Sequence, residues 1–312
     1  MDGLDIDIIR EMGVRPYLPG PKNPDSLKPS YLAKRIGSSV NTVKARVAKM
    51  EADGVIAGYQ VIPNLRHLGL TGAAYYFSRP PDEQKADAMA AMADMPGLLE
   101  IHDFLGRGFC IDFTHADDDA LATSLSILKA ITGETKPVKF YQRDMPPAGR
   151  ALTGLDWRIL QALRFRAKRS LDDVGAGLGV TGRTVRTRYS RMAREGSFFA
   201  VPMLDPSRAG GLFLFEILLY IEPGRFNEVT VAFHEQMRGH LVYAKVPSTP
   251  ALGHWDALVF AATTADVEDL RAAAADIAGV TRAEAWLFRG LHDHGSWMDE
   301  AIAAKIAELA PP

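Results

Sequence analysis

The sequence predicts a mixed α+β protein made of two copies of one two-part unit. Three observations lead to this prediction. The chain has 312 residues, which suits about two domain lengths of 150 residues. It repeats itself at about that spacing. Within each copy, apolar residues first recur at helical intervals and then follow an alternation of strands and helices.

The repeat is carried by two pairs of matching segments. Residues 3–9 recur as residues 154–160, and residues 36–46 recur as residues 178–188. The register continues from there without a gap. Proline and glycine in residues 146–153 indicate an exposed linker between the two copies.

The first part of each copy reads as three short helices. In copy one we expect them over residues 4–12, 29–36 and 40–53, with a glycine just after each of the last two. Residues 55–62 alternate weakly, which predicts a short hairpin. A proline-rich and glycine-rich loop at residues 16–24 has no counterpart in copy two and is expected on the surface.

The second part of each copy reads strand, helix, strand, strand, helix, strand, which is the ferredoxin-like order βαββαβ. The expected elements are residues 70–79, 82–95, 98–105, 108–114, 117–131 and 136–143 in copy one, and residues 212–222, 224–237, 240–247, 255–263, 265–277 and 281–289 in copy two. A last amphipathic helix, over residues 296–309, has no counterpart in copy one.

The second and third helices of each first part, joined by a tight turn at glycine, form a helix-turn-helix pattern. The fold class is therefore two winged helix-turn-helix domains alternating with two ferredoxin-like domains. The predicted boundaries are residues 1–64 and 154–206 for the winged helix-turn-helix domains, 65–145 and 207–291 for the ferredoxin-like domains, 146–153 for the linker and 292–312 for the C-terminal helix.

The third helix of each first part has to bury one face and present the other. In copy one, Val43, Val47 and Met50 are spaced for the buried face. The opposite face carries side chains of the types that contact base edges and phosphates. The candidate DNA-binding residues are Ser39, Asn41, Thr42, Lys44, Arg46 and Lys49 in copy one, and Thr181, Arg183, Thr184, Arg186, Arg188 and Arg191 in copy two.

The whole-chain net charge of −2 conceals an uneven distribution. Residues 1–59 hold 9 basic and 7 acidic residues, and residues 155–196 hold 10 and 4. The remaining segments are acidic. Residues 183–194 carry five arginines and no acid. A helix face that only keeps a protein soluble usually mixes both signs, so this distribution favours double-stranded DNA as a partner.

These features resemble the Lrp/AsnC (feast/famine) family of prokaryotic transcription regulators. The matching residues are Leu4-Asp5, Ile8-Ile9, Leu32-Ala33, Ile36-Gly37-Ser38, Thr42-Val43, Arg46, Met50-Glu51, Gly54-Val55-Ile56 and Leu68-Gly69-Leu70, with Leu155-Asp156, Ile159-Leu160, Leu178-Gly179-Val180-Thr181, Thr184-Val185 and Arg188 in copy two. Copy two departs from the family at Gly196-Ser197-Phe198-Phe199, where a Gly-Val-Ile wing is usual.

The resemblance implies ferredoxin-like domains that dimerise and sense small molecules, often amino acids. Two units in one chain imply either a homodimer or an intrachain pseudo-dimer, whose sheets pair because each has an open face to cover. The family carries a Gly-x-x-Asp turn beside its effector pocket. Copy two matches it with Gly253, Trp255 and Asp256 as candidate effector-binding residues, whereas a glycine turn that binds nothing explains the same pattern.

Other chemical signals are weak. The G-x-G-x-x-G pattern at residues 177–182 follows an expected helix start, whereas a dinucleotide site needs a strand before it. His292-Asp293-His294 is expected in a loop, and His102 shows no metal spacing along the sequence. Cys110 alternates with apolar residues and is expected in the core. We therefore expect no metal, no cofactor and no enzymatic activity.

The acidic start of the chain and its short apolar runs predict a cytoplasmic protein with no membrane segment. Two alternatives to a DNA-binding regulator stay open. The same two-part unit resembles siroheme decarboxylases, which occur as paired or fused copies and bind a tetrapyrrole with His and Arg, although their chemistry leaves the basic helix face unexplained. The other alternative is an effector sensor or structural adaptor that does not bind DNA.

Overall fold

The computed structural model describes residues 1–13, 26–77, 82–106, 108–143, 147–244 and 253–310, so the predicted surface loop at residues 16–24 lies outside the described part of the chain. The chain forms two compact units. The ferredoxin-like unit contains residues 1–6, 72–144 and 205–294, and the winged-helix unit contains residues 7–71, 145–204 and 295–312. Each unit therefore combines the corresponding parts of both copies.

The ferredoxin-like unit confirms the predicted α+β fold class and element order. Copy one contributes β2 (Thr71–Phe77), α4 (Asp82–Met92), β3 (Leu98–Phe104), β4 (Phe109–His115), α5 (Asp118–Thr132) and β5 (Val138–Arg143). Copy two contributes β7 (Phe213–Ile221), α9 (Phe226–Gln236), β8 (Leu241–Ala244), β9 (His254–Ala261), α10 (Thr264–Ala275) and β10 (Val280–Asp293). Carboxylates fix two of the helix starts: Asp117 accepts from the Ala120 N–H, and Thr263 and Asp266 form a capping box.

The strands are hydrogen-bonded in the order β5-β2-β4-β3-β10-β7-β9-β8. β10 joins the two copies, since residues 280–287 pair with β7 and residues 288–293 pair with β3. The sequence predicted that this strand ends at residue 289 and that His292 and Asp293 lie in a loop, which was wrong. The extra residues cover the edge of β3, whose backbone groups need hydrogen-bond partners.

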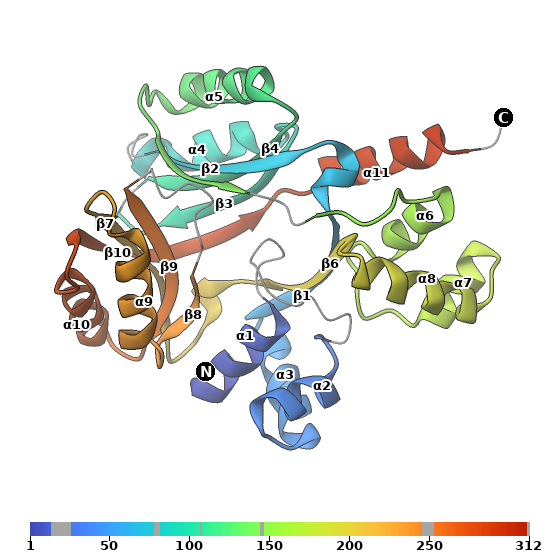
Figure 1. The fold of residues 1–312 in the computed structure, drawn as a ribbon, viewed down its shortest axis with the longest axis horizontal. Helices are drawn as coiled ribbons and strands as arrows, with labels where there is room; N and C mark the ends of the chain where they lie inside the picture. Colours follow the sequence, from blue (N-terminus) through green and yellow to red (C-terminus); the bar gives the residue numbers. More distant parts are fainter. Residues whose placement is uncertain (14–25, 78–81, 107, 144–146, 245–252, 311–312) are drawn as a thin grey trace. The chain divides into compact units, whose positions relative to one another are not determined.

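The two faces of the paired strands have different coverings. Helices α4 and α5 cover one face of the copy-one strands, and α9 and α10 cover one face of the copy-two strands (Figure 1). The opposite faces meet in a cluster of five buried residues: Ala74, Phe104 and Cys110 from copy one, and Leu218 and Trp286 from copy two. The expected pairing of the two sheets thus takes place within the chain, and Cys110 is a core residue as predicted.

The winged-helix unit holds two sets of three helices, although only residues 7–12 of the first helix belong to it. They are α1 (Gly3–Met12), α2 (Pro29–Ile36) and α3 (Val40–Ala52) from copy one, and α6 (Gly154–Leu163), α7 (Leu171–Leu178) and α8 (Gly182–Arg194) from copy two. The sharp turns before α3 and α8 are made by Gly37 and Gly179 in the left-handed conformation. Gly175 lets α7 approach the next turn, because a Cβ there would lie 2.8 Å from the Val180 carbonyl oxygen.

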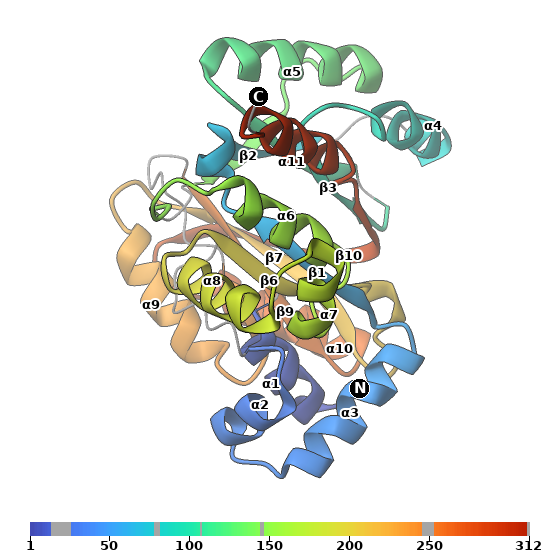
Figure 2. The same cartoon turned by 90° about the vertical axis from the view of Figure 1, so that its right-hand side faces the viewer.

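The predicted hairpin of copy one is instead a single strand, so that prediction was wrong. β1 (Ile56–Pro63) pairs antiparallel with β6 (Phe198–Leu204), the corresponding strand of copy two (Figure 2). The local alternation of apolar residues was read correctly as a strand, but its hydrogen-bonding partner lies about 140 residues further along the chain.

The C-terminal helix α11 (Trp297–Glu308) packs on α6 in the same unit. Arg164, which directly follows α6, holds α11 in place. Its buried guanidinium donates to Gln60 Oε1 at 2.6 Å and to the Gly295 carbonyl oxygen at 3.2 Å, and it lies 3.3 Å from an Asp299 carboxylate oxygen. Among the described residues, none of the helices has both the length and the apolar character that crossing a membrane requires.

Candidate functional site

The starts of α3 and α8 are built alike from hydroxyl side chains. Ser39 caps α3 by accepting from the Thr42 N–H at 3.0 Å, and Thr181 caps α8 by accepting from the Thr184 N–H at 3.1 Å. In each pair the two hydroxyl oxygens also lie within 2.9 Å of each other. Four of the predicted DNA-binding residues therefore also fix the helix starts, where backbone N–H groups favour a phosphate.

The arginines of α8 fall into two groups. Arg188 and Arg191 turn towards Asp156 of α6, with nitrogen–oxygen distances of 3.0 and 2.7 Å. Burial alone would raise the pKa of Asp156, but hydrogen bonds from Thr153 and the two arginines outweigh burial and hold the pKa below its usual value. The carboxylate is fully buried, so this arrangement holds α8 on α6.

The second group faces solvent. Arg186 pairs with the exposed Asp172 at 2.7 Å. Arg183 and Arg194 are exposed and form no ion pair with any residue that the structure describes. Exposed pairs contribute little to stability and open readily, so these three side chains are the ones in α8 that are available to a phosphate backbone.

The corresponding surface of α3 in copy one carries fewer positively charged side chains than that of α8. Asn41, Thr42 and Lys44 are exposed on α3, and Lys44 has no ion-pair partner within the described ranges. Lys49 pairs with Asp53 at 2.6 Å, one turn further along. Arg46 is half-buried. DNA contacts by the candidate residues of both helices remain predictions.

Glu51 joins the two copies inside the winged-helix unit. Its carboxylate accepts from the Tyr59 hydroxyl at 2.7 Å and from Lys168 Nζ of copy two at 2.8 Å, and the same ammonium lies 3.6 Å from the centre of the Tyr59 ring. Burial and the bond to Glu51 raise the pKa of Tyr59 well above its usual value. The phenol therefore stays protonated and keeps donating.

The three candidate effector residues do not share one face. Gly253 has a positive φ of 68° and stands just before β9. Trp255 points into the core beneath α9, where its ring packs against the ring of Phe233 with 4.9 Å between the ring centres. Asp256 follows on the strand and so points to the opposite face, towards the other sheet. Of these side chains, only that of Asp256 reaches the space between the sheets, and effector binding remains a prediction.

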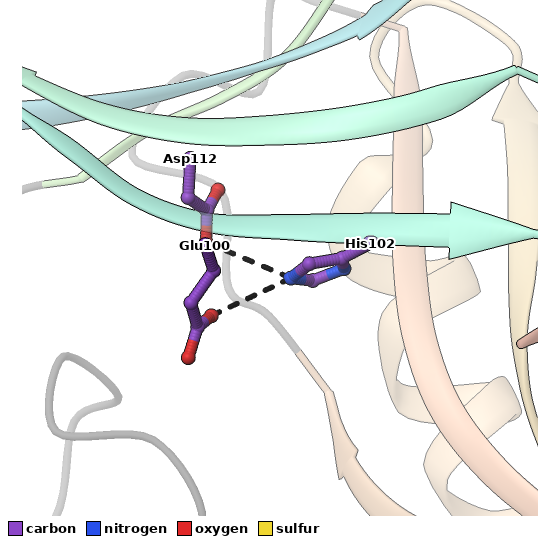
Figure 3. Close-up of side chains that lie close together, drawn as sticks. All are labelled: Glu100, His102 and Asp112. Carbon is purple, nitrogen blue, oxygen red and sulfur yellow. Dashed lines mark hydrogen bonds and ion pairs between the residues drawn. The ribbon is translucent and has the colours of Figure 1, made fainter. Parts of the chain in front are cut away.

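A second group of polar side chains lies on that same intersheet face. Glu100 and His102 are alternate residues of β3, and Asp112 is the cross-strand partner of Glu100 on β4. His102 Nε2 lies 3.5 Å from Glu100 Oε2 and 3.8 Å from Asp112 Oδ2 (Figure 3). Its other ring nitrogen, Nδ1, lies 3.3 Å from Glu216 Oε1 of β7. His102, Asp112 and Glu216 are fully buried, and Glu100 is 26% exposed.

Sequence spacing did not reveal this group, because its members come from three strands and both copies. The available signal was the pattern on each strand. Glu100 and His102 flank Ile101, and Asp112 stands between Ile111 and Phe113, so charged residues alternate with core residues on buried strands. Charged side chains on an inward face mark a site or a buried network rather than a solvated edge.

Comparison with known proteins places these parts in context. Residues 22–57 match the HTH_24 family, described as winged helix-turn-helix DNA-binding, so copy one contains a domain of that type. Siroheme decarboxylase NirDL has the same overall fold, with a TM-score of 0.55 and 10% identity over 99% of both chains. Its complex with an iron-uroporphyrin III analogue matches with the same score and identity, over 99% of this chain and 100% of that one.

An AsnC family transcriptional regulator from Agrobacterium tumefaciens is 19% identical and matches with a TM-score of 0.32, over 47% of this chain and 97% of its own. Among curated protein sequences, no significant match exists. The sequence led us to expect no enzymatic activity, and the full-length match to a decarboxylase overturns that expectation.

Proposed function

We propose that the chain is a DNA-binding transcription regulator of the Lrp/AsnC type, acting in the cytoplasm through the N-terminal halves of α3 and α8. The observation that carries the proposal is the match of residues 22–57 to winged helix-turn-helix DNA-binding domains. The exposed side chains on α8 support it. Arg183 and Arg186 stand in the first turn and a half of the helix, next to its capped N-terminus, where a recognition helix meets the duplex.

The internal pairing of the two copies also supports this proposal. The β1–β6 ribbon and the Glu51–Lys168 bond hold two helix-turn-helix modules in one unit. Regulators that bind as dimers place two recognition helices on successive turns of the major groove. One chain with two modules supplies the same number of helices without a second subunit.

The test is a binding series with the full chain and fluorescent fragments of the DNA upstream of its own coding region. Binding through several phosphates must weaken steeply as salt rises. The double variant Lys44→Ala, Arg183→Ala should bind about tenfold more weakly or worse, with a shallower salt slope. A matched control is Arg166→Ala, which removes an exposed arginine outside both helices. No binding at low salt, or binding independent of salt, would reject the proposal.

A second candidate function is chemistry on a tetrapyrrole, favoured by the full-length fold shared with siroheme decarboxylase. The two functions can coexist, because the helix-turn-helix surfaces and the ferredoxin-like sheets are separate parts of the chain.

Adding iron-uroporphyrin III to the full chain and recording its absorbance tests this second candidate. A shifted absorption band that saturates at one equivalent, followed by release of CO₂ from a carboxylated substrate, would establish it. An unchanged spectrum at excess protein would remove it and leave the DNA-binding proposal intact.

A further inference from the structure

We propose that Glu100, His102 and Asp112 form a binding site for one divalent transition-metal ion, with Glu216 holding the histidine in place. The proposal goes beyond DNA binding and does not depend on it. Its basis is that donor atoms from three residues, the His102 Nε2 and one carboxylate oxygen each from Glu100 and Asp112, all lie within 4.8 Å of one another.

The spacing of these donor atoms suits an ion. Metal–nitrogen and metal–oxygen bonds of about 2.0–2.2 Å place neighbouring ligand atoms roughly 3.0–3.5 Å apart. The Nε2 atom already lies 3.5 and 3.8 Å from the two carboxylate oxygens. All three side chains point to the same side of two neighbouring strands, so their donor atoms face one common position (Figure 3).

An independent feature points the same way. Metal-binding histidines almost always donate their second ring N–H to a carboxylate or carbonyl, which sets the tautomer and the orientation of the ring. Glu216 Oε1 stands 3.3 Å from His102 Nδ1 and is fully buried. The imidazole is thus held with Nδ1 directed at an acceptor and Nε2 directed at the two remaining carboxylates, which is the arrangement a metal ligand requires.

A divalent ion between Nε2 and the two carboxylates would place its charge at the centre of a cluster in which His102 and Asp112 are fully buried. Glu100 alone is partly exposed, so it marks the side from which an ion enters.

The donor set indicates the class of ion. One imidazole nitrogen and two carboxylate oxygens suit Zn²⁺, Mn²⁺ or Fe²⁺ better than Mg²⁺ or Ca²⁺, which prefer oxygen alone. Three protein ligands leave a coordination position for water or for an oxygen donor of a small molecule. Because Glu216 belongs to copy two, a bound ion also ties the copy-one strands to β7.

The test uses the full chain after treatment with EDTA and titration with Zn²⁺ in competition with a chromophoric chelator. We expect one tightly bound ion per chain. His102→Gln should remove this binding or weaken it by about 100-fold, and Glu216→Gln should weaken it by about 10–100-fold. His240→Gln is the control and should leave the affinity unchanged, because the His240 ring contacts the backbone and ring of Phe260, outside the proposed site.

Glu100→Gln is expected to fold even if the variants at the buried His102 and Glu216 do not, because the Glu100 side chain is partly exposed and Gln has the same size. It should weaken Zn²⁺ binding while circular dichroism stays that of the parent. Co²⁺ gives a second readout, since visible absorption bands should appear in the parent and be lost in Glu100→Gln. Equal Zn²⁺ affinity in the parent and in the Glu100 and His102 variants would overturn the proposal, as would failure of the parent to bind one ion.

Discussion

The candidate recognition helices of the two copies, α3 and α8, differ strongly in their charge by sequence and much less in the charge that the structure leaves unpaired. Five arginines on α8 suggest a far stronger positive field than the two lysines and one arginine of α3. In the structure, Arg188 and Arg191 form ion pairs with the buried carboxylate of Asp156, and Arg186 forms an ion pair with the exposed Asp172. The cations without an ion pair to a described residue are Arg183 and Arg194 on α8 and Lys44 on α3.

This difference shows that a count of charges along a helix overstates the charge offered to a partner. Arginines on the inner flank of α8 serve the fold, because each buried carboxylate needs cations beside it. Copy two therefore uses part of its basic character for internal support.

The largest expected effect concerns a buried arginine that copy two has and copy one lacks. Arg164 directly follows α6, whereas Gly13 directly follows α1. Arg164→Ala should lower the free energy of unfolding of the winged-helix unit by about 3–5 kcal/mol, since it leaves buried acceptors without their donor. Urea unfolding of the parent and the variant, followed by circular dichroism, measures this. The exposed Arg166→Ala should change it by less than about 0.5 kcal/mol, and equal losses in both variants would contradict the assignment.

The next effect separates the two kinds of ion pair on α8. Asp156→Asn should cost about 2–3 kcal/mol at neutral pH, because a buried carboxylate with two arginines is lost. Asp172→Asn, at the exposed pair, should cost less than about 0.5 kcal/mol. Urea unfolding of both variants gives the two numbers side by side, and a loss of similar size at Asp172 would remove the distinction.

Acid should erase the effect of Asp156→Asn. Folding holds the pKa of Asp156 below its usual value, so its stabilisation is present above the unfolded-state pKa of about 3.9 and is lost as pH falls through the folded-state pKa. The stability difference between parent and variant should therefore shrink steadily below about pH 4. A difference that stays constant into acid would show that the carboxylate charge is not its source.

Most secondary structure could be predicted from local pattern, and the long-range pairings could not. Helix α2 was predicted over residues 29–36 and is observed as Pro29–Ile36, because Pro29 and Gly37 mark its ends. The pairing of β1 with β6 and the continuation of β10 to β3 join segments more than 130 residues apart. Nothing in a local alternation says which strand will supply the hydrogen bonds, although the repeat did imply a partner of the same kind.

For the candidate sites too, local features could be predicted and long-range contacts could not. Helical spacing correctly placed Val43, Val47 and Met50 in the core and left Asn41 and Lys44 outside. It could not show that Arg188 would turn to Asp156, since this pair joins α8 to α6. Likewise, His102 became a candidate ligand only when β3, β4 and β7 were seen side by side.

Binding should distinguish the two helices, provided that the chain binds DNA as proposed. Arg183→Ala should weaken binding by about 1–3 kcal/mol if the side chain reads a base, or by less than 1 kcal/mol for a phosphate contact. Lys44→Ala should cost about 1 kcal/mol or less and lower the salt slope by about one unit. Fluorescence anisotropy at several salt concentrations measures both. A larger loss for Lys44→Ala than for Arg183→Ala would reverse the ranking of the two copies.

The smallest expected effect is a gain. Arg186 Nη1 lies 2.7 Å from Asp172 Oδ2 on an exposed surface, so under the DNA-binding proposal Asp172 would compete with a phosphate for this arginine. Asp172→Asn removes the competing charge and lets Arg186 reach a phosphate at no cost, so binding should tighten by up to about fivefold, or 1 kcal/mol. Arg186→Ala should abolish this gain when combined with Asp172→Asn, because the two side chains act on each other. A gain that persists in the double variant would mean that loss of a negative charge near α8, and not release of Arg186, improves binding.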